Sequence, residues 1–161
     1  SPLQMSDTVF ELTPAQRTRL APGWTISKSG ANTQESEAEL AGRGYRVPTG
    51  GLFSTLDDMT RWLRFQMGEP APTVFDAAAL AKAQRRIAIS GPGLRVGYGI
   101  GIQFRRYGDR VVFGHSGGVP GYQAEMYFDP EQRTGIVILR SAVFGTFDTE
   151  AILSAAFSTA R

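Results

Sequence analysis

The chain contains no cysteine, a single histidine (His115) and only two lysines among its 161 residues. The lack of cysteine excludes disulfides, thiol catalysis and cysteine-based metal sites, although it leaves the cellular compartment undecided. With one histidine, only carboxylates remain to complete a zinc shell, and no His-Glu-x-x-His pattern is present. The sequence therefore predicts neither a metal site nor a bound cofactor.

A strong charge of one sign is absent as well. The formal net charge is +2, and no run of basic residues is longer than two, so a nucleic-acid partner is not predicted. No apolar run approaches the ~20 residues that a membrane span needs, so no membrane span is predicted either. The compartment stays open, because periplasmic, secreted and cytoplasmic locations all fit the sequence.

The remaining composition is that of an ordinary folded domain, with 42% hydrophobic and 20% charged residues. The chain divides near residue 90 into two parts of one domain. Residues 1–90 form the helical and loop part, in which a polar stretch at 27–44 is expected to be a surface loop. The main helix is indicated by a capping-box pattern, Ser54-x-x-Asp57, and by apolar residues at helical spacing around it. These apolar residues are Leu52, Leu56, Met59 and Leu63.

Residues 91–161 form the strand part, because the apolar period changes to two after Val96. Gly97, Gly99 and Gly101 are expected on one bare face of a single strand, and residues 107–110 are expected to turn the chain into the next strand. Further strands are predicted around residues 123–128 and 136–139, followed by a helix capped by Asp148. The predicted fold class is α+β: an antiparallel meander of about four strands with a C-terminal helix packed on it.

The segment that points most directly to chemistry is the glycine-rich end of the strand that begins at Val111. This strand delivers the imidazole of His115 to its own end, where Gly117 and Gly118 follow. Glycine lacks a Cβ, so another molecule can approach its backbone amide closely. Aimed amides of this kind stabilise the oxyanion of acyl transfer. The alternative interpretation is an edge strand that ends in a tight turn with an incidental histidine.

His115-Ser116-Gly117 resembles the third active-site motif of serine hydrolases related to β-lactamases and penicillin-binding proteins, which is His-x-Gly in many esterase- and aminopeptidase-like members. Three further segments resemble family motifs in the same order along the chain. They are Pro2–Thr8, with Gln4 where glycine is usual, Pro48–Thr55, and the Tyr-Gly-x-Gly strand at Tyr98. The resemblance implies a β-lactamase-like fold of the class C-related esterase or D-aminopeptidase type.

Two motifs of that superfamily are missing from this sequence. The nucleophile and its activating lysine normally form Ser-x-x-Lys, but Thr25 and Ala79 stand three residues before Lys28 and Lys82. No tyrosine is followed two residues later by asparagine. We therefore expect the chain to be the C-terminal part of a larger enzyme, with the N-terminal part of the domain absent. An N-terminal half of the same enzyme or a second chain is expected to complete the sheet.

The resemblance assigns roles to His115 and Gly118. His115 contacts a substrate carboxylate or steadies the proton-transfer network, and the backbone N–H of Gly118 is the second oxyanion donor. Ser116, Gly117 and Tyr122 are candidates for substrate binding, with simple packing of the turn as the alternative for Tyr122. Ser116 is not expected to be the nucleophile, because neighbouring side chains on a strand point to opposite faces and His115 cannot readily deprotonate it.

Two functions follow as hypotheses. The first is a serine hydrolase that cleaves an ester or an amide through an acyl-enzyme, with a β-lactam or a D-amino-acid peptide among the candidate substrates. The second is a noncatalytic relative that keeps the fold for binding or scaffolding. A Ser-x-x-Lys motif in the missing part favours the first hypothesis. Fold alone does not choose between ester, lactam and peptide.

The isolated chain is predicted to be catalytically inactive, because without Ser-x-x-Lys acyl transfer has no covalent route. Incubation with a fluorophosphonate probe should leave it unlabelled, and a chromogenic short-chain ester should show no turnover above buffer. Stoichiometric labelling would contradict the prediction and make Ser116 or another serine of this chain the nucleophile.

Overall fold

The computed structural model describes residues 2–27, 29–34, 49–71, 76–85, 88–90, 95–143 and 147–158. The helices in these ranges are α1 (Pro14–Arg17), α2 (Leu56–Gln66), α3 (Ala77–Ala83) and α4 (Thr149–Ser158). The strands are β1 (Trp24–Ile26), β2 (Asn32–Gln34), β3 (Ala88–Ser90), β4 (Val96–Tyr98), β5 (Gln103–Tyr107), β6 (Arg110–Val119), β7 (Tyr122–Asp129) and β8 (Thr134–Arg140).

The main sheet is an antiparallel meander in which each strand pairs with the next one along the chain, in the order β3-β4-β5-β6-β7-β8. This confirms the predicted α+β class and the C-terminal helix. The described residues hold six strands in this sheet rather than about four. The additional strands are β3 and one from the division of the predicted strand after Val96 into β4 and β5. Both β3 and β4 have three residues, which is too short for a clear alternating pattern.

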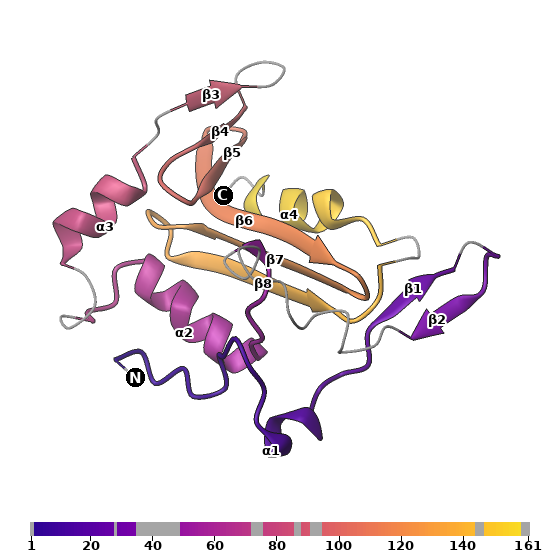
Figure 1. The fold of residues 1–161 in the computed structure, drawn as a ribbon. Helices are drawn as coiled ribbons and strands as arrows, with labels where there is room; N and C mark the ends of the chain where they lie inside the picture. Colours follow the sequence, from indigo (N-terminus) through magenta and orange to yellow (C-terminus); the bar gives the residue numbers. More distant parts are fainter. Residues whose placement is uncertain are drawn as a thin grey trace.

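The two faces of the sheet carry different helices (Figure 1), as α2 contacts β7 and β8 and α4 contacts β5 and β6. Each helix buries its own apolar cluster against the sheet. On the α4 face, Leu153 and Phe157 of the helix meet Tyr107, Val112 and Tyr127 of the strands. On the α2 face, Leu63 packs with Ile102, Met126 and Phe128. The molecule is therefore a three-layer arrangement of helix, sheet and helix.

The helix starts follow the predicted capping chemistry with one shift in position. Asp76 and Asp148 accept hydrogen bonds from the amides of Ala79 and Ala151, as expected for helix caps. The cap of α2 is Thr55 instead of Ser54, and its side chain accepts from the Asp58 amide. The hydroxyl of Ser54 is instead within 2.9 Å of the Thr8 hydroxyl.

The prediction of one strand with a bare face of three glycines is wrong. The strand ends at Tyr98, and Gly101 lies in the hairpin turn to β5 with φ of 67°, a conformation that favours glycine. Gly97 serves a separate purpose, because a Cβ there would stand 2.1 Å from the Ala88 carbonyl oxygen of β3. The glycines therefore answer two local backbone constraints and do not form one surface.

The predicted surface loop at residues 27–44 is partly a hairpin. Asn32–Gln34 pairs with Trp24–Ile26, and this hairpin projects from one end of the sheet (Figure 1). Residues 28 and 35–44 lie outside the described residues. Near the start of the chain, Gln4 has φ of 54°, in the left-handed region that favours glycine, which gives a physical reason why glycine is usual at that position of the motif.

A buried carboxylate joins the N-terminal segment, here residues 2–10, to α2. Asp58 is only 1% exposed, and its carboxylate accepts hydrogen bonds from the Asp7 amide, the Thr8 hydroxyl and the Arg61 guanidinium at 2.8–2.9 Å. The charge is therefore well solvated by protein donors in place of water. Since these donors come from segments about fifty positions apart, this side chain holds two distant parts of the chain together.

Replacing Asp58 by alanine should lower the free energy of unfolding by about 2–3 kcal/mol, because the half-buried amide of Asp7 and the Thr8 hydroxyl lose a charged acceptor. Urea denaturation followed by circular dichroism measures the change. Asp57→Ala is the matched control, since Asp57 is an exposed carboxylate in the same helical turn, and its loss should cost less than ~1 kcal/mol. Equal effects of the two substitutions would show that the buried bonds carry no special weight.

Candidate active site

The strand that carries the histidine motif has one open edge in the described part of the chain. The β5–β6 pairing runs from Tyr107↔Arg110 and stops at Gln103↔Gly114. Beyond Gly114, β6 continues to Val119 and pairs only with β7 among the described residues. The histidine motif therefore lies on a stretch of strand whose second edge is unpaired within the structure.

In an antiparallel pair, alternate residues bond to the partner strand, and the residues between them direct their backbone groups to the other edge. The β6–β7 hairpin has a two-residue loop, Pro120-Gly121, so Val119↔Tyr122 is a hydrogen-bonded pair and alternate pairs follow it. Gly117 and His115 then bond to β7, whereas the N–H and C=O groups of Ser116 and Gly118 point toward the open edge. The amide predicted as an oxyanion donor, that of Gly118, is thus directed away from the partner strand.

A cavity of about 550 Å³ lies beside this edge, between the sheet and the helices α2 and α3. His115, Ser116 and Gly117 line it, whereas Gly118 and Tyr122 do not. Much of the remaining lining is apolar, from Met59, Trp62, Phe65, Leu80, Ile100, Ile102, Met126 and Leu139. The volume is in the range of small-molecule sites, and three of the five predicted site residues meet there.

The glycines of the motif have no packing role within the described chain. A Cβ at Gly117 would meet no atom within 4 Å, and one at Gly118 would make only ordinary contacts at 3.5 Å or more. Gly114 on the same strand is different, because a Cβ there would stand 1.9 Å from the Met126 carbonyl oxygen. Neither Gly117 nor Gly118 has a positive φ. Space for another molecule therefore remains a reason for glycine at 117 and 118.

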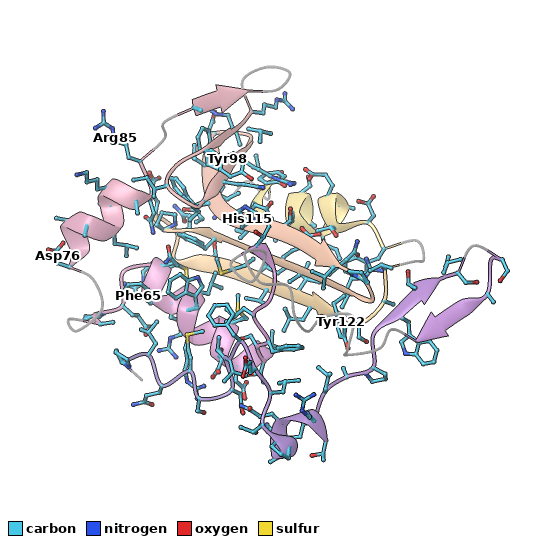
Figure 2. All side chains as sticks on the ribbon, viewed as in Figure 1. Phe65, Asp76, Arg85, Tyr98, His115 and Tyr122 are labelled. Carbon is cyan, nitrogen blue, oxygen red and sulfur yellow. The ribbon has the colours of Figure 1, made fainter. Side chains whose placement is uncertain are left out.

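His115 is exposed and lies on the α2 face, opposite Met126 in the β6–β7 register. This is the face that strand parity predicts. Its Nδ1 is 2.7 Å from the Ser116 carbonyl oxygen, and its Nε2 is 3.3 Å from the hydroxyl of Tyr98. The two rings meet edge to face at a centroid distance of 5.9 Å (Figure 2). Both ring nitrogens thus have polar neighbours from this chain.

Tyr98 was missed as a site residue by sequence reasoning, although it belongs to the recognised Tyr-Gly-x-Gly motif. Its partner in the β4–β5 register is Gln103, whose Nε2 donates to the Tyr98 hydroxyl at 2.7 Å. The expectation of one continuous strand after Val96 hid this pairing, because it left no turn at Gly101 to bring Gln103 back alongside Tyr98. The motif signal was present, but the hairpin that gives it meaning was not predicted.

Tyr122 is placed away from the cavity. Its hydroxyl donates to the Ala21 carbonyl oxygen at 2.8 Å, and its ring covers Gly23, where a Cβ would stand 2.5 Å from the ring. Figure 2 places it toward β1, apart from Tyr98 and His115. The structure therefore gives Tyr122 a contact that anchors the N-terminal segment, and does not bring it together with the motif.

Two buried tyrosines stand on the opposite face of the sheet. Burial raises the pKa of Tyr107 to about 12 and also raises the pKa of Tyr127. The guanidinium of Arg105 lies over the Tyr127 ring, 4.8 Å from its centroid, and acts in the other direction on the pKa of that phenol. Both hydroxyls stay protonated at neutral pH and so remain hydrogen-bond donors.

In the described part of the chain, no group of three or more histidine, aspartate or glutamate residues could hold a metal ion. No helix in the described ranges is long and apolar enough to cross a membrane.

Solved structures share this fold at low sequence identity. An octameric penicillin-binding protein homologue from Pyrococcus abyssi matches at a TM-score of 0.68 and 20% identity, over 88% of this chain and 31% of its own. A D-stereospecific amidohydrolase from Streptomyces sp. matches at 0.71 and 17%, over 99% and 46%. A class C β-lactamase mutant matches at 0.73 and 14%, over 98% and 48%. The chain thus spans less than half the length of each.

No curated protein sequence matches the chain, but the model of the family named β-lactamase matches residues 1–160. That match covers all the motifs discussed above, and the solved structures agree with it in fold. The chain therefore belongs to the β-lactamase family.

Proposed function

We propose that this chain is the C-terminal part of a serine hydrolase that cleaves an ester or an amide through an acyl-enzyme, with the nucleophilic serine and its lysine outside the chain. The observation that carries the proposal is the open edge of β6 beside the cavity. There, His115 and the outward-facing amide of Gly118 stand at a stretch of strand that no other described strand pairs, where a Cβ at Gly117 would meet no atom.

The chemistry proposed for this edge is stabilisation of a tetrahedral intermediate. A serine hydroxyl from the missing part adds to the carbonyl carbon, and the carbonyl oxygen takes up the negative charge. The Gly118 amide donates to that oxygen, and the amide of the nucleophilic serine is the second donor. The C–O or C–N bond to the leaving group then breaks, and water releases the acyl group in a second addition. Ser116 binds substrate and is not the nucleophile.

The substrate proposed is a small ester or amide, and two observations support this range. The cavity is mostly apolar with few polar groups, as small-molecule sites are. The structural relatives include a D-stereospecific amidohydrolase and a class C β-lactamase, whose names both denote cleavage of an amide-type bond. A β-lactam and a D-amino-acid amide or peptide are therefore both within the proposal.

The partner proposed is the segment that carries Ser-x-x-Lys, supplied by the same enzyme or by a second chain. Support comes from apolar surface that the described chain leaves uncovered beside the cavity. Ile100 is 60% exposed and Leu139 is 41% exposed, and both line the cavity. Burying such side chains contributes roughly 25 cal/mol for each Å² of apolar surface removed from water, which favours association with the missing segment.

His115→Ala in the protein that supplies both parts should reduce kcat/KM for small esters by ~10²-fold, while the melting temperature stays nearly unchanged because the side chain is exposed.

Gly118→Pro removes the proposed oxyanion amide and should reduce kcat by about 10²–10³-fold. Because that amide points away from β7, the substitution leaves the β6–β7 ladder intact. Full activity in both His115→Ala and Gly118→Pro, with folding intact, would show that the motif has no catalytic role.

Gly117→Ala tests whether the space beside the motif is used by substrate. The added methyl group meets no atom of the described chain, so the free energy of unfolding should change by no more than ~0.5 kcal/mol. The expected result is a raised KM for esters, because the methyl group projects where substrate passes. Gly114→Ala is the contrasting variant: its methyl group clashes with the β7 backbone, and urea denaturation should show a loss of more than about 2 kcal/mol. Unchanged ester kinetics in Gly117→Ala would place the substrate elsewhere.

A further inference from the structure

The hydrogen bonds around His115 form one connected chain with a defined direction. Tyr127 donates from its hydroxyl to Gln103 Oε1 at 3.1 Å, and Gln103 Nε2 donates to the Tyr98 hydroxyl at 2.7 Å. The Tyr98 hydroxyl is 3.3 Å from His115 Nε2, and Nδ1 is 2.7 Å from the Ser116 carbonyl oxygen. The chain ends at this carbonyl, which can only accept a hydrogen bond.

The contacts at Nδ1 and at Nε2 together determine which ring nitrogen of His115 carries the proton. Because the Ser116 carbonyl oxygen is an acceptor, Nδ1 must bear a hydrogen to bond with it. In the neutral ring, Nε2 then has a lone pair and accepts from the Tyr98 hydroxyl. Tyr98 is free to donate because its oxygen already accepts from Gln103. Every bond in the chain therefore has one donor and one acceptor.

The opposite direction is consistent only with a different charge state. If Tyr98 donated to Gln103, its oxygen would need a proton from Nε2, and the ring would be an imidazolium with both nitrogens protonated. The Gln103 amide would also have to turn over, so that its Nε2 faced the Tyr127 hydroxyl. Burial raises the pKa of Tyr127, and the protonated phenol is a ready donor to the amide oxygen in the observed direction.

The topology of the sheet explains how these hydrogen bonds reach the histidine. Strand alternation places Gln103 on the same face as Tyr107, which is the α4 face, and the register places Tyr98 beside Gln103 on that face. His115 lies on the α2 face. The hydrogen bonds cross from one face to the other at the point where β5 ends and the edge of β6 opens.

We infer that Tyr98 is a positioning residue for His115, which it holds through Gln103 and Tyr127 in the Nδ1–H tautomer with an acceptor at Nε2. The role of this arrangement in catalysis rests on the proposed function. A ring with a lone pair at Nε2 accepts from a hydroxyl group and offers no donor there to a carboxylate, which can also only accept. His115 therefore belongs to the proton-transfer network and does not donate a hydrogen bond to a substrate carboxylate.

The tautomer is directly measurable because His115 is the only histidine of the chain. The full 161-residue chain, labelled with [¹⁵N]histidine, is observed by NMR at alkaline pH. We expect a protonated, pyrrole-type Nδ1 and an unprotonated, pyridine-type Nε2. In Tyr98→Phe, the hydroxyl donor to Nε2 is gone, and both resonances should move toward the averaged positions of a mixture of tautomers.

Tyr107→Phe is the matched control, since it removes a hydroxyl from β5 that lies in the α4-side cluster and outside this chain of hydrogen bonds. It should leave both ¹⁵N resonances unchanged, and dispersed amide spectra establish that each variant is folded. An Nε2–H tautomer in the unsubstituted chain would overturn the inference, as would identical histidine resonances in the unsubstituted chain and Tyr98→Phe.

In the protein that supplies both parts of the site, Tyr98→Phe should also lower kcat/KM for neutral esters by about tenfold, the effect of one hydrogen bond. A protein with the expected tautomer but no hydrolysis would contradict the proposed function and leave the positioning role intact. Hydrolysis by a protein with the Nε2–H tautomer would support the proposed function and contradict the positioning role of Tyr98.

Discussion

The pairing of β6 with β7 is the interaction on which the rest of the structure depends. It runs through seven residue pairs, from Phe113↔Phe128 to Val119↔Tyr122. At one end, Phe128 and Tyr127 supply the two opposite faces on which α2 and α4 pack. At the other end, the same ladder sets the phase that turns the Gly118 amide outward. One strand pair thus fixes the core and aims the candidate site.

The strand faces and most helix starts can be predicted from the sequence, because they depend only on the spacing of residues along the chain. Strand alternation places His115 on the α2 face, and the run of small residues after it marks the open edge. The helix starts at Thr55 and Asp148 are recognisable from side chains that satisfy orphan amides, with an error of one position at α2. Local chemistry decides these features, so a single sequence contains them.

The features that were not predicted depend on contacts between distant or adjoining segments. The short strand β4 has too few residues to show a period, so the hairpin that brings Gln103 to Tyr98 was invisible. The contact of the Tyr122 hydroxyl with Ala21 joins residues 101 positions apart, and no pattern within either segment indicates it.

The Asp58 carboxylate has a consequence for how the molecule opens. By bonding to residues 50 and 51 positions earlier, it closes a loop of about fifty residues, and closing such a loop costs roughly 3–4 kcal/mol of chain entropy. The bonds to this buried charge offset that cost together with the Val9↔Phe53 bridge beside them. No residue of the β6–β7 ladder takes part in this closure, so hydrogen exchange at the Asp7 amide is a direct measure of how often residues 7–9 separate from α2.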